Sequence, residues 1–239
     1  MAGARMALRG WRKAAPANSR LPLPYEVVMM LANFFLHQHM KEQALLTLIM
    51  FNLYLRPSEP HRLQHGDIIA PVAGSGARHF CWAVTLHPWE RGTPSKTLEF
   101  DESLLIDQDD FAFLGPALAR LRGAASAEKP LFKVTQAEYA RSLAAATQRL
   151  GVAEICSYQL RHSGASHDAA MRLRSLAEIQ RRGRWRAQSS CRRYEKGGRV
   201  TEQLRALKPH IRAHAVACAQ SIERVVRGLQ PPLPPPSGR

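Results

Sequence analysis

Three separated segments of the chain hold residue types that suit chemistry on a phosphate group. They read LRPSE at 55–59, YQLRHSGAS at 158–166 and GRWRAQSSCRRY at 183–194. Arginine offers a planar, permanently charged fork that fits two phosphate oxygens, and an indole N–H donates a hydrogen bond but never accepts one. A tyrosine hydroxyl can act as a nucleophile that forms a covalent intermediate. The candidate side chains are Arg56, Arg161, Trp185 and Tyr194.

Each of these signals also has an ordinary structural explanation. Arg56 follows an apolar run and would suit the C-terminal end of a helix dipole. Arg161 and His162 could lie on a solvated helix face, and Tyr194 could be a half-buried packing residue with a bonded hydroxyl. The order and spacing of the segments, rather than any single residue, therefore decide the interpretation.

That order resembles the tyrosine recombinase (phage integrase) family, in its Cre-like variant with tryptophan in the third box. In the family an LRxSE box is followed by a hairpin lysine, an HxLRH box, a G-H/W box and a tyrosine nine residues later. This chain has LRPSE at 55–59, a lysine at 96, YQLRH at 158–162, GRW at 183–185 and a tyrosine at 194. The resemblance covers about residues 20–205.

The resemblance implies a set of roles in breaking and rejoining DNA. Arg56 and Arg161 would grip the non-bridging oxygens of the scissile phosphate, and Trp185 would donate its indole N–H to that phosphate. Lys96 would be the general acid for the leaving 5′ oxygen, with Lys133 and Arg91 as weaker rivals. Tyr194 would become a 3′-phosphotyrosine, so neither a nucleotide nor a metal cofactor is expected.

The second box departs from the family pattern at its first position. Tyr158 stands where the family usually has a histidine, and a phenol with a pKa of about 10 is a poor base near neutral pH. We still expect Tyr158 to belong to the catalytic set. Glu59 is expected to buttress Arg56, and His162 to form a structural hydrogen bond beneath the site.

Two other functions fit some of the same residues. The first is a catalytically inactive DNA-binding relic of a mobile-element recombinase, which Tyr158 favours. The second is a type IB topoisomerase, against which the LRPSE box argues. The family normally has an N-terminal clamp domain as well, and without one the resemblance predicts poor DNA affinity and impaired activity.

Charge indicates a polyanionic partner. The chain has 34 Lys and Arg against 19 Asp and Glu, a net charge of +15. Fourteen of these basic residues lie between 161 and 212 with only four acids, whereas 25–160 is nearly neutral. We therefore expect double-stranded DNA as the partner, although a merely solubilising basic surface would look similar. The predicted DNA contacts are Arg181, Arg182, Arg184, Arg186, Arg192 and Arg193.

The apolar pattern predicts a mainly helical domain with one small antiparallel sheet of three strands (α+β), the fold of the recombinase catalytic domain. The strands are expected at 67–72, 79–86 and 95–101, where Gly- and Pro-containing turns separate short β-like pieces. Apolar residues at helical spacing predict the helices. The expected helices are 25–39, 41–55, 109–122, 136–149, 158–172, 175–182 and 201–227.

Composition divides the chain into three parts. Residues 1–22 are a basic arm that fits a transit peptide, a DNA-contacting arm or a linker stump. Residues 23–228 would be the catalytic domain, and 229–239 a Pro-rich, disordered tail. The apolar stripe of 201–227 fits two roles, docking on a neighbouring copy to form a homo-oligomer on DNA, or serving as the last helix of its own domain.

The remaining features indicate an intracellular protein. None of the four cysteines lies in a CxxC pair, so reduced thiols are expected. The longest apolar run, 44–55, is too short to span a membrane and predicts a buried helix. The expected location is with DNA, in the nucleus if the source is eukaryotic, with organellar targeting by the arm as an alternative.

Overall fold

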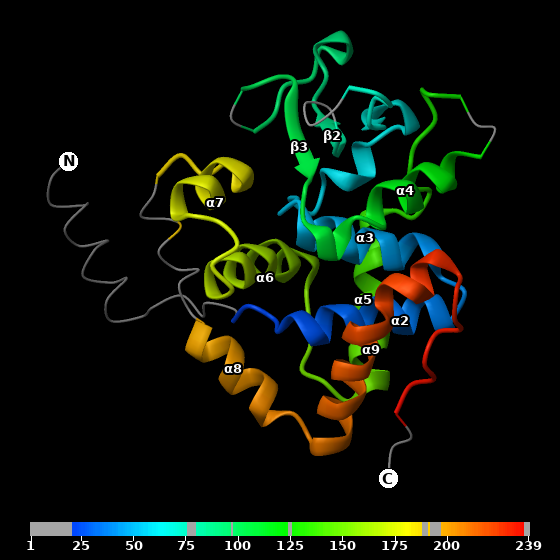
Figure 1. Ribbon diagram of the computed structural model, residues 1–239, viewed down its shortest axis with the longest axis vertical. Helices are drawn as coiled ribbons and strands as arrows, with labels where there is room; N and C mark the ends of the chain where they lie inside the picture. The colour runs from blue at the N-terminus through cyan, green and yellow to red at the C-terminus, as the bar shows by residue number, and fades with distance from the viewer. Residues whose placement is uncertain are drawn as a thin grey trace, which may run out of the picture.

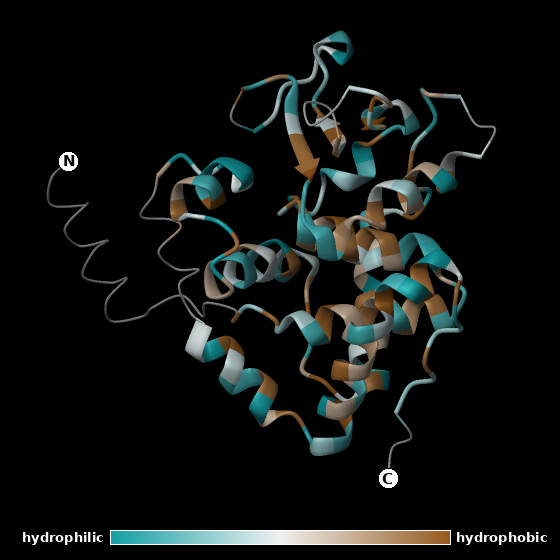
Figure 2. Ribbon diagram, viewed as in Figure 1, coloured by the Kyte–Doolittle hydropathy of each residue, from teal (hydrophilic) through white to brown (hydrophobic). Residues whose placement is uncertain are grey.

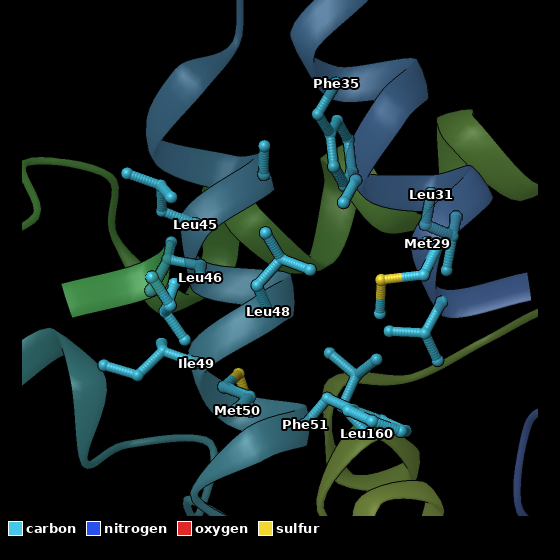
Figure 3. Packing of buried hydrophobic residues seen from close by; sticks show 14 of the residues in the cluster. Met29, Leu31, Phe35, Leu45, Leu46, Leu48, Ile49, Met50, Phe51 and Leu160 are labelled. Carbon is cyan, nitrogen blue, oxygen red and sulfur yellow. The ribbon is translucent and has the colours of Figure 1, made fainter. Parts of the chain in front are cut away.

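Two helices that are apolar on nearly every side form the centre of the molecule. The computed structural model describes residues 21–75, 80–96, 98–123, 126–187, 191 and 197–236. Helix α2 (Tyr25–His37) is buried without interruption over residues 27–35, and α3 (Lys41–Asn52) from residue 44 to its end. Such all-round burial is typical of a central helix. Figure 3 shows labelled Met, Leu and Phe side chains of the two helices, with Leu160 of a neighbouring helix beside Phe51.

The remaining helices pack around this pair (Figure 1). Helix α6 contacts α3 and also α7, whereas α9 lies along α2. The surrounding helices, α7 among them, each combine hydrophobic and hydrophilic residues (Figure 2). Their bounds are α4 (Leu114–Arg122), α5 (Gln136–Leu150), α6 (Ser157–Ala170), α7 (Leu176–Gly183), α8 (Gly197–Ala206) and α9 (Pro209–Arg227).

A three-stranded antiparallel sheet lies at one end of the molecule (Figure 1). Its strands are β1 (Ile68–Ile69), β2 (Trp82–Leu86) and β3 (Glu102–Ile106), with Ile68 opposite Val84 and Ala83 opposite Leu105. The expected sheet is thus confirmed, but its third strand is not at 95–101. That segment turns, because Leu98 and Asp101 have left-handed backbones with φ of 65° and 54°, which an extended strand excludes.

The last predicted helix is in fact two helices. Lys208 has an extended backbone with ψ of 142°, and Pro209 begins α9. A proline at the first helical position is favourable, but within a helix it removes a hydrogen bond and clashes with the preceding turn. The boundary at Pro209 therefore separates α8 from α9.

The apolar stripe of α9 is used inside its own chain. Ile211, Ala215, Cys218, Ile222 and Val226 are buried and belong to the same core as α2. Of the two roles expected for this stripe, α9 has the second, because its apolar face packs against α2 in the core of its own domain.

The Pro-rich end is extended but attached to the core. Asn33, buried in α2, donates from Nδ2 to the Leu233 carbonyl at 2.8 Å and accepts from the Leu233 N–H at 3.0 Å. The expectation of a disordered tail therefore fails around residue 233, because a buried amide satisfies both backbone groups there. No described helix has the length and apolarity needed to cross a membrane.

Candidate active site

Arg56 is fixed by Glu59 at the end of the apolar run. The chain leaves α3 at Asn52, and the following turn brings Glu59 back beneath Arg56. The Glu59 carboxylate accepts from the Arg56 backbone N–H at 2.6 Å and from the Arg56 guanidinium at 2.8 Å. Glu59 is 4% exposed and the Arg56 side chain 18%. The two residues therefore have the geometry of the expected buttress.

Arg161 lies on α6 and is 2% exposed. Its guanidinium donates to the backbone carbonyls of Tyr54 and Gly183, and the Trp185 ring lies 4.6 Å from its central carbon. Burial, together with the neighbouring Arg184 cation, lowers the pKa of Arg161 to about 10. Arg161 therefore stays charged near neutral pH while being almost closed off from solvent.

A third arginine joins this group. Arg184 follows α7 in a left-handed conformation with φ of 55°. It donates to Glu59 Oε2 at 2.8 Å and to the Tyr54 carbonyl at 3.1 Å. Glu59 thus links the LRPSE and GRW segments, which are more than a hundred positions apart in the sequence. We call Arg56, Arg161 and Arg184 with Glu59 the arginine cluster.

Trp185 and Gly183 depend on each other. A Cβ added at Gly183 would fall 1.7 Å from the Trp185 ring, so only glycine allows the indole to fold back over this turn.

Beside the cluster, Tyr158 is 47% exposed and meets His162 edge to face, with 4.5 Å between ring centroids. The structure thus brings the second and third boxes together.

The candidate general acid lies away from these contacts. Lys96 is exposed in the connection between β2 and β3, and no hydrogen bond or ion pair among the described residues joins it to the arginine cluster. The alternative candidate Arg91 forms an ion pair with Asp67, with N–O distances of 2.6 and 2.9 Å. The other rival, Lys133, is exposed, and its backbone N–H donates to Glu42.

The predicted DNA-contacting arginines divide into two kinds. Arg181 and Arg186 are exposed, as a phosphate contact requires. Arg182 is instead buried, with Nε donating to the Asn52 carbonyl at 3.1 Å, and the Arg184 side chain is 6% exposed. Both side chains are therefore largely internal and are not exposed in the way that Arg181 and Arg186 are. The other predicted residues lie outside the described part of the chain: Arg192, Arg193 and Tyr194.

Two side chains beside the cluster had no signal in the sequence. Glu102 begins β3 and is 8% exposed; its nearest cation is Arg184, at 3.9 Å. Burial raises the pKa of Glu102, although Arg184 acts in the opposite direction. His87 directly follows β2. One of its ring nitrogens lies within 4.8 Å of a carboxylate oxygen of Glu59 and of Glu102.

These three groups have ligand types that a metal ion accepts, but their surroundings do not favour one. Glu59 already accepts from two guanidinium groups, and Arg184 also faces Glu102. A divalent cation would have to displace these partners against the repulsion of both arginines. The arrangement instead suits an anion, because it concentrates guanidinium donors in a largely buried place.

Known proteins supply no further assignment. No protein-family model matches the chain, and no curated protein matches its sequence.

Proposed function

We propose that this chain breaks and rejoins double-stranded DNA by transesterification, as a tyrosine recombinase does. The observation that supports this most is the meeting of Arg56, Arg161 and Trp185, held by Glu59 and the Tyr54 carbonyl. Nothing in their sequence positions requires these three side chains to be neighbours. Two guanidinium groups and an indole donor at one place form the equipment for stabilising a phosphoryl transition state.

In the proposed reaction the Tyr194 hydroxyl gives its proton to water while its oxygen attacks the phosphorus, and the bond to the 5′ oxygen breaks. The 5′ oxygen takes a proton, for which Lys96 is the candidate donor, and the 3′ phosphate remains on Tyr194. Attack by a free 5′ hydroxyl reverses the step and releases the tyrosine. The bond energy is conserved, so rejoining needs no nucleotide.

A DNA-binding relic is the second candidate, and one observation favours it. Arg161 donates hydrogen bonds to two backbone carbonyls and is 2% exposed. A catalytic Arg161 must become accessible before its remaining N–H donors can reach phosphate oxygens. A protein that only binds DNA needs no such opening.

Recovery of covalent protein–DNA adducts tests the proposal. Cells that express the chain are denatured rapidly with detergent, and the DNA attached to protein is recovered and sequenced. We expect adducts from the native chain and none from Tyr194→Phe, while noncovalent DNA affinity stays nearly unchanged. Tyr139→Phe is the matched control, because it also removes one phenol hydroxyl, but in the main core and outside the catalytic set, and it should retain adducts.

The outcomes separate the two candidates. Adducts that persist in Tyr194→Phe would show that the assigned nucleophile is wrong. Folded native protein that binds DNA but never forms adducts would favour the relic.

A further inference from the structure

Tyr54 has a conformation that its residue type disfavours. It lies two residues beyond α3, is fully buried, and has a left-handed backbone with φ of 49°. A bulky residue in this region is a genuine outlier and persists only where the surroundings hold it in place. The contacts of Tyr54 show what holds it and what it holds in turn.

The backbone carbonyl of Tyr54 points into the arginine cluster. It accepts a hydrogen bond from Arg161 and a second from Arg184, at 3.1 Å. One oxygen therefore sets the position of two guanidinium groups from different elements. A change of the Tyr54 backbone would move both donors together.

The hydroxyl of Tyr54 is anchored on the opposite side. It donates to Asp168, which is 2% exposed. Asp168 also accepts from Gln108 Nε2 at 2.8 Å and from Arg174 Nε at 2.9 Å. With three donors on one buried carboxylate, the anchor is firmly oriented.

This anchor belongs to a closed ring of polar contacts. Arg174 and Arg182 both reach Asp107, Arg182 donates to Asn52, and Asn52 donates to Gln108 at 2.7 Å. The ring therefore ties the end of α3 to the end of α7. Its members are Asn52, Gln108, Asp168, Arg174, Asp107 and Arg182.

The aromatic ring of Tyr54 connects the two sides. Its centroid lies 5.6 Å from the Arg182 guanidinium carbon and 6.2 Å from the Trp185 ring centroid. Tyr54, Trp185 and Ile179 also share a small buried cluster that is separate from the main core. Tyr54 thus contacts both Arg182, a member of the ring of polar contacts, and the Trp185 indole that covers Arg161.

We propose that Tyr54 is a positioning residue, whose hydroxyl bond to Asp168 holds its carbonyl and ring where they orient Arg161, Arg184 and Trp185. The value of this role for DNA cleavage rests on the proposed function. The positioning itself does not, because it can be measured in protein without DNA. Asp168 is the second positioning residue, because it accepts the hydrogen bond from the Tyr54 hydroxyl.

The test compares two tyrosines that each lose one buried hydroxyl bond. Tyr54→Phe removes the bond to Asp168, and Tyr139→Phe removes the equivalent bond to Thr47, at 2.8 Å in the main core. Asp168 and Thr47 each keep another hydrogen bond after the change. Tyr54→Phe should lose more stability than Tyr139→Phe, because its lost partner is a carboxylate, so the site is compared under conditions in which both variants are fully native.

Fluorine NMR of protein labelled with 5-fluorotryptophan reports on the site directly. The Trp185 resonance is identified by its disappearance in Trp185→Phe, and Trp82, which packs on Gly115, serves as an internal reference. We expect the H2O/D2O solvent isotope shift of Trp185 to rise in Tyr54→Phe and to stay unchanged in Tyr139→Phe. Asp168→Asn, which keeps the volume of the anchor, should move the Trp185 signal in the same direction.

Cleavage adds a second readout. We expect Tyr54→Phe to slow adduct formation by about 10- to 100-fold, as expected for misplaced catalytic groups, with little change in DNA affinity. If Tyr54→Phe matches Tyr139→Phe in the isotope shift of Trp185, the positioning role is overturned. If the native chain forms no adducts, the proposed function fails, and the isotope shifts alone decide the role of Tyr54.

Discussion

The arginines of the site carry their charges in a largely closed environment. Burial lowers the pKa values of Arg161, Arg182 and Arg184, yet the value of about 10 for Arg161 leaves it cationic near neutral pH. Desolvating a cation is expensive unless partners surround it. Glu59, Asp107 and backbone carbonyls supply those partners. The cost is consistent with a functional need for guanidinium donors at this place.

Glu102 gives a prediction at the residue scale. Its folded-state pKa lies above the ordinary value because of burial, so the unfolded chain ionises first as the pH rises. The protein therefore loses stability as the pH rises from the ordinary pKa through the folded one. We expect Glu102→Gln to raise the melting temperature at pH 8 and to change it little at pH 4, measured by calorimetry.

The exposed Glu99 supplies the control for this experiment. Glu99 lies three residues earlier on the same hairpin and is exposed, so Glu99→Gln should leave the melting temperature nearly constant at both pH values. A gain of 1 kcal/mol corresponds to roughly 2–4 °C in a chain of this size. A lower melting temperature for Glu102→Gln at pH 8 would mean that the ion pair with Arg184 outweighs the desolvation of Glu102.

At the scale of elements, short segments hold the site. Helix α7 has only eight residues, and a capping box of Ser175 and Glu178 begins it. Its far end carries Arg182, Arg184 and Trp185, each fixed by contacts to α3, its following turn or α6. The helix therefore owes much of its orientation to these contacts, since one this short is marginal alone.

The attached tail is the element whose removal gives a clear prediction. A chain that ends at Gln230 loses both hydrogen bonds between Leu233 and Asn33 and the packing of Leu233 on the core. We expect it to be less stable by about 1–3 kcal/mol, from unpaired buried groups and lost apolar contact. Urea denaturation measures the difference.

A chain that ends at Pro236 is the matched control, because it keeps Leu233. It should have the stability of the full chain. Equal stability of the chains ending at Gln230 and Pro236 would contradict the anchoring role of Asn33.

At the scale of the whole molecule, basic charge serves two purposes. Part of it is internal, as in Arg161, Arg182 and Arg184, and stabilises the packing of α3, α6 and α7. Another part, including Arg181 and Arg186, is exposed and available for phosphates. The count of 34 basic residues therefore overstates how many of them expose their charge on the surface.

Adjacent arginines in α7 test this division. We expect Arg181→Ala to weaken DNA binding and to reduce the slope of log affinity against log salt by about 0.9, the loss of one phosphate contact. Arg182→Ala should instead lower the melting temperature, because it removes one of the two cations that face Asp107 and the guanidinium donor of the Asn52 carbonyl. Salt-dependent binding titrations and thermal unfolding measure the pair. The reverse assignment of effects would contradict the internal role of Arg182.

The local pattern of the sequence predicted most of the elements. Apolar spacing located α2, α3, α5, α6 and α7 to within a few residues, because burial of one face or a whole helix leaves a periodic trace. It misplaced the third strand, since Leu98 and Asp101 have left-handed backbones and a leucine carries no turn signal. It joined α8 to α9, although Pro209 stands at their boundary.

The sequence by itself determined the helical framework, the small sheet, and the candidates Arg56, Glu59, Arg161 and Trp185. Only the tertiary structure decided which arginines are internal, that Tyr54 joins two of them, and that Glu102 and His87 face the same place. The physical reason is that neighbouring arginines such as Arg181 and Arg182 have the same local propensity. Their environments differ only because packing between distant segments buries one side chain and leaves the other in water.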